Sequence, residues 1–270
     1  MEKIHYGYGL PPDFSSHGAG IDNLINVLHI FMAVLFVGWG IFFVVTLIKF
    51  RQREGHRASY ESASSKLPKI AEVAVVLFEA FLLIGLSFPI WNYYKSNPPP
   101  ADKALTVRVV AQQFVWNIHY PGADGKFGRT DIKYMDDSNP LGVDPNDPNS
   151  ADDFFTINQF NMPVNKPIIA QITSKDVIHS FGVPLLRVKQ DAVPGQVVPI
   201  WFTAIKTGQF DIHCSQLCGV GHSLMKGTIT VQNAEDFQKW EDEQPKPWKK
   251  TIPPPAPQAK TPQPSEGQKG

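Results

Sequence analysis

The sequence is poor in cysteine: its 270 residues include only Cys214 and Cys218. Secreted folds that are held together by disulfides use more cysteines at wider spacing, so a disulfide scaffold is excluded. An excess of basic charge is also lacking, because 25 lysines and arginines balance 25 acidic residues. Proteins that bind nucleic acids normally carry a basic excess, so we expect no nucleic-acid partner.

Charged residues are absent from a long apolar run between Ile30 and Ile48. Its length is close to the ~20 residues that cross the hydrocarbon core of a membrane. A second apolar run extends from about Ala71 to Trp91. Buried core helices are the alternative, but soluble cores rarely need an uninterrupted apolar run of this length. The two runs therefore predict a hairpin of two transmembrane helices within residues 24–95.

The loop between the two runs is basic. Its lysines and arginines include Lys49, Arg51, Arg53, Arg57, Lys66 and Lys69. The polar segment 1–23 contains only Lys3 and lacks the pattern of a cleaved signal peptide. Since cytoplasmic loops are enriched in lysine and arginine, we expect this loop inside the cell and both chain ends outside. The predicted location is an inner membrane, with residues 1–23 as an extracytoplasmic tail. A bacterial membrane is favoured, and a mitochondrial one is the alternative.

After a proline-rich linker around Pro98, the sequence changes to short β-branched segments separated by turn signals. These segments are 105–111, 167–173, 197–203, 209–213 and 226–231. Several short strands with no long helix between them predict an all-β sandwich or barrel, which we assign to residues 96–243.

Two stretches depart from this strand pattern. Residues 121–153 are rich in Asp, Asn, Pro and Gly, and we interpret them as a surface insertion. Residues 244–270 are dominated by proline, lysine and glutamine, a composition that predicts a disordered tail. Between them, a short helix is expected from Asn233 to about Glu243.

The segment that begins at Cys214 concentrates metal-binding side chains. It contains Cys214, Cys218, His222 and Met225. Thiolates with a thioether form a soft ligand set, which favours copper over calcium, magnesium or manganese. A structural zinc site would use four Cys or His ligands and no Met. Three residues separate the cysteines, whereas a thioredoxin motif and a c-type haem site both require two.

The number of thiolates indicates how many metal ions the loop could hold. A mononuclear blue-copper site takes one Cys, two His and a weak axial Met, so this loop has one thiolate too many. Two thiolates can instead bridge two copper ions, each with one His and one weak axial ligand. We expect the second His to be His179 and the remaining axial ligand to be a backbone carbonyl near Gln216. A disulfide is the alternative, which His222 and Met225 in register disfavour.

These residues closely resemble subunit II of haem–copper cytochrome c oxidases. The resemblance spans about residues 20–240 and rests on the Cys-x3-Cys-x3-His-x2-Met loop, His179, the turn at 191–195 and the hairpin. It implies a cupredoxin-like β-domain that holds a dinuclear copper centre, CuA. It also implies an enzyme subunit that takes electrons from a c-type cytochrome and passes them to haem in subunit I, where oxygen is reduced to water.

The resemblance also implies a role for each ligand. Two thiolates would bridge the coppers, each copper would bind one imidazole, and a thioether and a carbonyl would be the axial ligands. The residues at these positions are Cys214, Cys218, His179, His222, Met225 and the carbonyl of Gln216.

Two positions depart from the family pattern. The family usually has Glu where this chain has Gln216, and that carboxylate helps to bind magnesium or manganese at the subunit interface. The backbone carbonyl that would bind copper is kept at Gln216. Whether magnesium or manganese binds at the interface is left open by the sequence, because the carboxylate is missing. The family also favours Gln-Trp-x-Trp, with the first Trp at the surface that takes up electrons. Here Phe114 stands at that position and Trp116 at the second.

The second apolar run carries two carboxylates. Glu72 matches a glutamate that the family places at the mouth of a proton-uptake path, and Glu79 lies nearly two helical turns later on the same face. A carboxylate inside a membrane is a functional candidate, so both are predicted for proton uptake. The alternatives are an interface charge for Glu72 and a hydrogen bond to subunit I for Glu79.

Three other functions compete with the oxidase. Subunit II of a quinol oxidase would lack the copper ligands, all of which are present here. The small subunit of a copper-containing nitric oxide reductase would share the loop, and only its large subunit would distinguish it. A membrane-tethered copper-delivery protein would hold exchangeable copper, but it would need the hairpin only as an anchor.

Overall fold

The computed structural model describes residues 9–57, 60 and 65–248. Part of the predicted N-terminal tail, residues 1–8, and most of the predicted disordered tail, residues 249–270, lie outside the described residues. The chain divides into two compact units. One comprises residues 1–120 and 155–244, and the other comprises residues 121–154 and 245–270.

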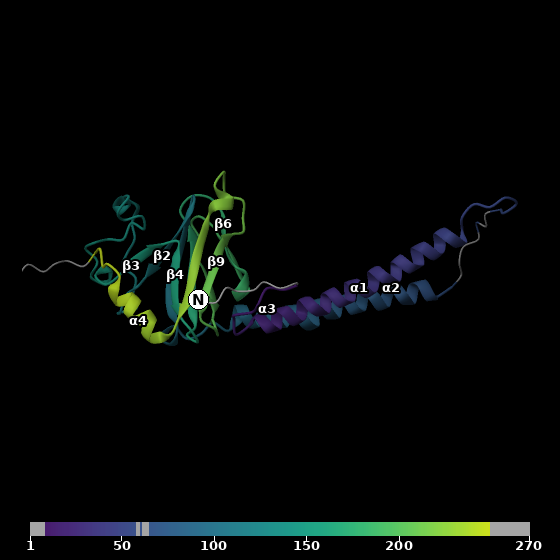
Figure 1. Ribbon diagram of the computed structural model, residues 1–270, viewed down its shortest axis with the longest axis horizontal. Coiled ribbons are helices and arrows are strands. Elements are labelled where there is room, and N and C mark those ends of the chain that lie inside the picture. Colours follow the sequence, from purple (N-terminus) through teal and green to yellow (C-terminus); the bar gives the residue numbers. More distant parts are fainter. Residues whose placement is uncertain (1–8, 58–59, 61–64, 249–270) are drawn as a thin grey trace, which may run out of the picture. The chain divides into compact units, whose positions relative to one another are not determined.

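The first unit contains a pair of long apolar helices (Figure 1). Helix α1 is Gly18–Lys49, and the second helix consists of α2 (Leu67–Ala80), a π-helical segment (Phe81–Ser87) and α3 (Phe88–Ser96). Both are long and apolar enough to cross a membrane. Their apolar side chains are mostly exposed, unlike those of a soluble core helix. The predicted hairpin is therefore present.

Helix α1 begins at Gly18, earlier than the apolar run alone indicates. The hydroxyl of Ser15 accepts a hydrogen bond from the backbone N–H of Gly18 at 2.9 Å, and the Asp13 carboxylate accepts one from Ser15 N–H. A side chain at Gly18 would collide with Asp13, since a Cβ there would lie 2.1 Å from its Oδ1. Local polar contacts, which hydropathy does not register, thus set the start of the helix.

The rest of this unit is a β-sandwich of two five-stranded sheets, in the orders β3-β2-β1-β5-β8 and β4-β10-β9-β6-β7. Its strands are β1 (Leu105–Gln112), β2 (Val115–Tyr120), β3 (Phe154–Ile157), β4 (Gln159–Pro163), β5 (Ile168–Ser174), β6 (His179–Val183), β7 (Val188–Ala192), β8 (Val198–Phe202), β9 (Gly208–Cys214) and β10 (Lys226–Gln232). The pairs β1–β5 and β4–β10 are parallel, and the pairs β1–β2, β5–β8, β9–β10, β6–β9 and β6–β7 are antiparallel. The expected all-β, cupredoxin-like domain is confirmed.

The core lies between the two sheets. Strand β5 alternates buried and half-buried residues along its length, as expected for a strand with one face on a core. Aromatic side chains fill the interior: the ring of Trp116 lies 5.6 Å from that of Phe181, and Phe160 and Phe202 are also fully buried. Helix α4 (Ala234–Glu243) follows β10, as the sequence predicts, and buries Phe237.

The described part of the N-terminal segment is held against the β-domain and is not a free tail. Phe14 N–H donates to Leu185 O at 2.9 Å, and Ser16 N–H donates to Thr203 O at 3.0 Å. The Phe14 ring lies 4.8 Å from the Phe210 ring. Polar composition did not reveal this pairing, because it depends on residues almost two hundred positions away.

The second unit corresponds to the polar stretch that was interpreted as an insertion. Between residues 121 and 153 its only helices are two short 3-10 turns, Ile132–Tyr134 and Pro148–Ser150. Its acidic side chains bind the loop's own backbone: the Asp136 carboxylate accepts from the N–H groups of Ser138 and Asn139. The Ser138 hydroxyl also donates to this carboxylate, and this bond, followed by the two backbone bonds, holds the pKa of Asp136 below its ordinary value. Acidic residues of this stretch thus stabilise the turns in which they lie.

Candidate metal centre

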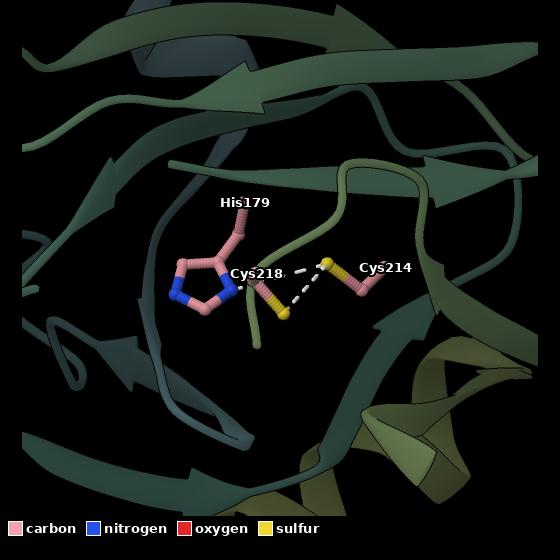
Figure 2. A group of neighbouring side chains, drawn as sticks. All are labelled: His179, Cys214 and Cys218. Carbon is pink, nitrogen blue, oxygen red and sulfur yellow. Dashed lines mark hydrogen bonds between the residues drawn. The ribbon is translucent and has the colours of Figure 1, made fainter. Parts of the chain in front are cut away.

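The side chains of the candidate centre come from the ends of two paired strands. Strand β9 ends at Cys214, and the loop that follows carries the other residues of the motif before β10 begins at Lys226. His179 is the first residue of β6, which pairs with β9 through Phe181 and Cys214. This pairing brings His179 beside the loop, and Figure 2 shows its ring facing both sulfurs. The ligand atoms of His179, Cys214 and Cys218 all lie within 4.8 Å of one another.

The two cysteines are close but not bonded. Their Sγ atoms are 3.7 Å apart, and both thiols are free. A disulfide requires a separation of about 2.05 Å. Two sulfurs at this spacing leave room for metal ions between them, so both could serve as bridging ligands.

Each sulfur has its own imidazole and its own weak donor. Cys214 Sγ lies 3.9 Å from His179 Nδ1 and 3.2 Å from the backbone oxygen of Gln216. Cys218 Sγ lies 3.6 Å from Nδ1 of its imidazole, His222, and 3.9 Å from the thioether sulfur of Met225. The residues therefore form two matched donor sets, each with a thiol, an imidazole and a weak ligand. That is the set a thiolate-bridged pair of copper ions needs, and it fits copper better than a hard cation.

Three of the candidate ligands are shielded from water: His179 is fully buried, Cys218 is 4% exposed and Met225 is 1% exposed. Cys214 and His222 are half-buried, and Gln216 is exposed. Burial, with a smaller contribution from the neighbouring Cys214, raises the pKa of the Cys218 thiol to about 11. A thiol must lose its proton to bind metal, so metal binding at Cys218 would release a proton at neutral pH.

A carboxylate fixes the orientation of His179. Asp176 Oδ1 lies 2.9 Å from His179 Nε2. Because a carboxylate can only accept, Nε2 carries the proton, and the lone pair of Nδ1 points toward Cys214. Asp176 also accepts from the N–H groups of Gln113 and Val177, both at 2.7 Å. Burial alone would raise the pKa of Asp176, but these hydrogen bonds and the imidazole hold it below its ordinary value.

The loop is braced by the turn between β1 and β2. The Gln113 side-chain amide donates to the backbone oxygen of Cys218 at 2.7 Å. The Phe114 ring lies on the loop at Gly219 and Gly221, where an added Cβ would be 3.1 Å and 2.6 Å from ring carbons. Glycine at these positions lets the aromatic ring approach the loop backbone closely.

The predicted site residues are thus not all in one place. The six predicted copper ligands come together, and Phe114, half-buried, lies against their loop. Trp116 is fully buried, with its ring 6.3 Å from that of His179. A protein docked on the surface could reach Phe114 but not Trp116, which leaves Trp116 a role inside the domain.

Glu72 and Glu79 belong to a different part of the first unit. Both are exposed on α2, within the apolar hairpin. Sequence reasoning also missed Asp176 and Gln113. No local signal distinguishes them, because an acidic residue in a turn usually caps only its own backbone.

Several known proteins are similar to this chain. The family described as "Cytochrome C oxidase subunit II, periplasmic domain" matches residues 105–233. The chain is 32% identical to a protein of Bradyrhizobium diazoefficiens named "Alternative cytochrome c oxidase subunit 2", over 83% of this chain and 80% of that protein. It is 29% identical to "Cytochrome c oxidase subunit 2" of Cereibacter sphaeroides, over 87% of this chain and 79% of that one.

Solved structures give a related result. The periplasmic domain of subunit II of cytochrome oxidase of Bradyrhizobium japonicum is 36% identical, with a TM-score of 0.40, over 54% of this chain and 95% of that domain. The two named proteins match more of this chain than the β-domain alone. They are named as subunits of an oxidoreductase complex, and the two apolar helices fit a membrane protein. This chain belongs to the cytochrome c oxidase subunit II family.

Proposed function

We propose that this chain is the electron-accepting subunit of a terminal respiratory oxidase. It would take electrons from a c-type cytochrome at a dinuclear copper centre and pass them to haem in subunit I, where oxygen is reduced to water. The observation that supports this most strongly is the pair of matched donor sets around Cys214 and Cys218. When bound, two thiolate-bridged coppers would share one electron, so the bond lengths between metal and ligands would change little on reduction.

The chain's own contribution is to hold the ligands rigidly. Three ligands lie at strand ends or in the loop between hydrogen-bonded strands: His179 starts β6, Cys214 ends β9, and Met225 directly precedes β10. Asp176 sets the tautomer of His179, and burial keeps water away from the Cys218 sulfur. A preorganised site suits fast electron transfer, because few groups have to move when the charge changes.

We assign the uptake of electrons to the surface around Phe114. This half-buried ring touches the loop that carries Cys218. Three apolar side chains of the same loop, Leu217, Val220 and Leu224, are more than three-quarters exposed. An exposed apolar patch of this kind marks a docking surface. Trp116 would then act from the interior, beside His179.

The remaining assignments concern subunit I and the membrane. Gln216 presents an exposed amide where the family has a carboxylate, so a magnesium or manganese ion at the subunit interface has one charged ligand fewer here. Glu72 and Glu79 are proposed for proton uptake, since charged groups in the apolar hairpin are otherwise unfavourable. The hairpin would span a bacterial inner membrane, with the β-domain on the periplasmic side.

Electron paramagnetic resonance of the full chain in detergent micelles, loaded with copper, tests the proposal. One electron shared by two equivalent copper nuclei gives a seven-line hyperfine pattern, whereas a single copper gives four lines. We expect two coppers per chain and the seven-line pattern. One copper with four lines, or readily exchanged Cu(I), would refute a dinuclear centre and favour copper delivery.

Asp176→Asn should weaken copper binding without unfolding the domain. The neutral amide no longer fixes the His179 tautomer, and changes to such outer groups typically cost about 10–100-fold in metal affinity. We therefore expect at least a tenfold loss of Cu(I) affinity in competition with a chelator. Asp211→Asn is the matched control, because Asp211 is exposed on β9. Equal affinities for the two variants would show that the hydrogen bond of Asp176 has no role.

A further inference from the structure

Arg187 makes an unusual set of contacts for a residue in a turn of the β-domain. It follows the 3-10 turn Pro184–Leu186 and directly precedes β7. Its Nε and Nη2 donate to the two carboxylate oxygens of Asp22, both at 2.7 Å. The side chains of Arg187 and Asp22 are only 8% and 19% exposed. A bidentate pair of this kind fixes direction as well as distance, and burial protects it from screening by salt.

The guanidinium of Arg187 joins three segments of the first unit. Besides Asp22 in α1, it donates from Nη1 to Pro184 O at 2.7 Å and from Nη2 to Pro11 O at 2.5 Å. Hydrogen bonding to Asp22 raises the pKa of Arg187 above its ordinary value. The β-domain, the start of the hairpin and the N-terminal segment therefore meet at one cation.

The backbone conformation of this turn does not favour arginine. Arg187 has φ of +53°, in the left-handed region, at the C-cap of the 3-10 turn. Glycine is the usual residue there, because it has no Cβ to clash. A side chain in this conformation persists only where its surroundings hold it. The hydrogen bonds to Asp22 and Pro11 stabilise Arg187 in this conformation. They explain why an arginine, and not a glycine, occupies the position.

Other contacts join the same parts of the chain. The Trp201 indole N–H of β8 donates to Tyr94 O, at the outer end of α3, at 2.8 Å. Phe14 and Ser16 bond to the backbone beside Arg187 and after β8. Both helices of the hairpin are thus attached to the β-domain, and Arg187 makes the charged, most directional link.

We propose that Arg187 is a positioning residue for electron transfer: with Asp22 it ties the copper-bearing β-domain to the outer end of the membrane hairpin. This inference rests on the proposed function. Arg187 contacts none of the candidate copper ligands, so it acts by fixing where the centre lies relative to the membrane-embedded partner. It affects the electron step that leaves this chain and not the step that reaches it.

The first variant to test is Arg187→Gly, which relieves the left-handed turn while it removes the tie. In the assembled oxidase we expect the copper spectrum and the donor-to-copper rate to be unchanged. The copper-to-haem rate should fall severalfold, because electron tunnelling slows exponentially as the distance between the two centres grows. Lys189→Gln is the matched control, because Lys189 pairs with Asp191 at the exposed surface.

Hydrogen exchange gives a readout that does not depend on copper. The amides of Phe14 and Ser16 should exchange at least about 30-fold faster in Arg187→Gly than in the wild type. This factor corresponds to the smallest effect usually seen when one partner of a buried charge pair is removed. Asp22→Asn leaves the turn intact and should reproduce the result. The double variant should be no worse than either single variant, because both remove the same link.

The outcomes distinguish a failure of the positioning role of Arg187 from a failure of the proposed electron-accepting function. Unchanged exchange and an unchanged copper-to-haem rate in both variants would overturn the role of Arg187. An altered copper spectrum, or an equal slowing of both electron steps, would also overturn it. A wild-type chain without the two-copper spectrum would refute the proposed function instead, and exchange would still decide whether the tie exists. If Arg187→Gly fails to assemble, exchange in the isolated chain in micelles decides the same point.

Discussion

Replacing one thiol, in Cys218→Ser, should abolish the dinuclear centre while leaving the β-domain folded. Cys218 Sγ lies 3.7 Å from Cys214 Sγ and 3.6 Å from His222 Nδ1, so its loss removes both the bridge and the link to the second donor set. A serine hydroxyl is a hard donor that keeps its proton at neutral pH, and it does not replace a thiolate on copper. We expect copper to fall from two ions to at most one per chain. The seven-line spectrum should be lost.

The control for this experiment is Ser223→Ala, which alters an exposed hydroxyl in the same loop. It should retain both coppers and the seven-line pattern. A Cys218→Ser variant that still holds two coppers with a shared electron would contradict the bridging role of Cys218. A result in which both variants lose copper would indicate that the loop as a whole is sensitive.

The second large effect is expected on stability. Trp116→Ala removes a fully buried side chain that packs 5.6 Å from the Phe181 ring and 6.3 Å from the His179 ring, measured between centroids. Truncation of a large buried aromatic typically lowers the free energy of unfolding by about 3–5 kcal/mol, through lost burial and the cavity that remains. Urea unfolding of the metal-free chain in micelles, followed by near-ultraviolet circular dichroism of the aromatic core, measures it.

Two further substitutions make the stability result specific. Trp116→Phe should lower the free energy of unfolding by less than about 1.5 kcal/mol, because among the described residues the indole N–H has no hydrogen-bond partner to lose. Trp39→Ala changes a side chain that is 65% exposed on α1 and should leave unfolding of the β-domain unchanged. A loss below about 1 kcal/mol for Trp116→Ala would mean that the core closes over the gap.

The hairpin and five strands of the β-domain could be predicted from the sequence because their signals are local. A charge-free apolar run is visible residue by residue, and β1, β5, β8, β9 and β10 show β-branched patterns between turns. Strands β2, β3, β4, β6 and β7 were not predicted. In β6 all five residues are buried. A strand buried on both faces has no alternation of apolar and polar residues to detect.

The candidate copper centre also has a part that the sequence predicts and a part that depends on strand pairing. Cys214, Cys218, His222 and Met225 lie in one loop, so their spacing alone predicts a soft two-metal site. The chain by itself also suggested His179, but its distance of 3.9 Å from Cys214 depends on the pairing of β6 with β9. Such pairing joins residues far apart in the sequence, and composition does not encode which ones.

The sequence by itself determined the hairpin of two apolar helices, the all-β class and the cluster of soft donor atoms after Cys214, because each follows from short-range patterns of hydropathy and residue type. Only the tertiary structure decided how the donors divide between two sulfurs, that Asp176 orients His179, that Trp116 is buried, and that Arg187 bonds to Asp22. Those relations are distances between segments that folding brings together. They are fixed by strand pairing and core packing, and no local stretch of sequence specifies them.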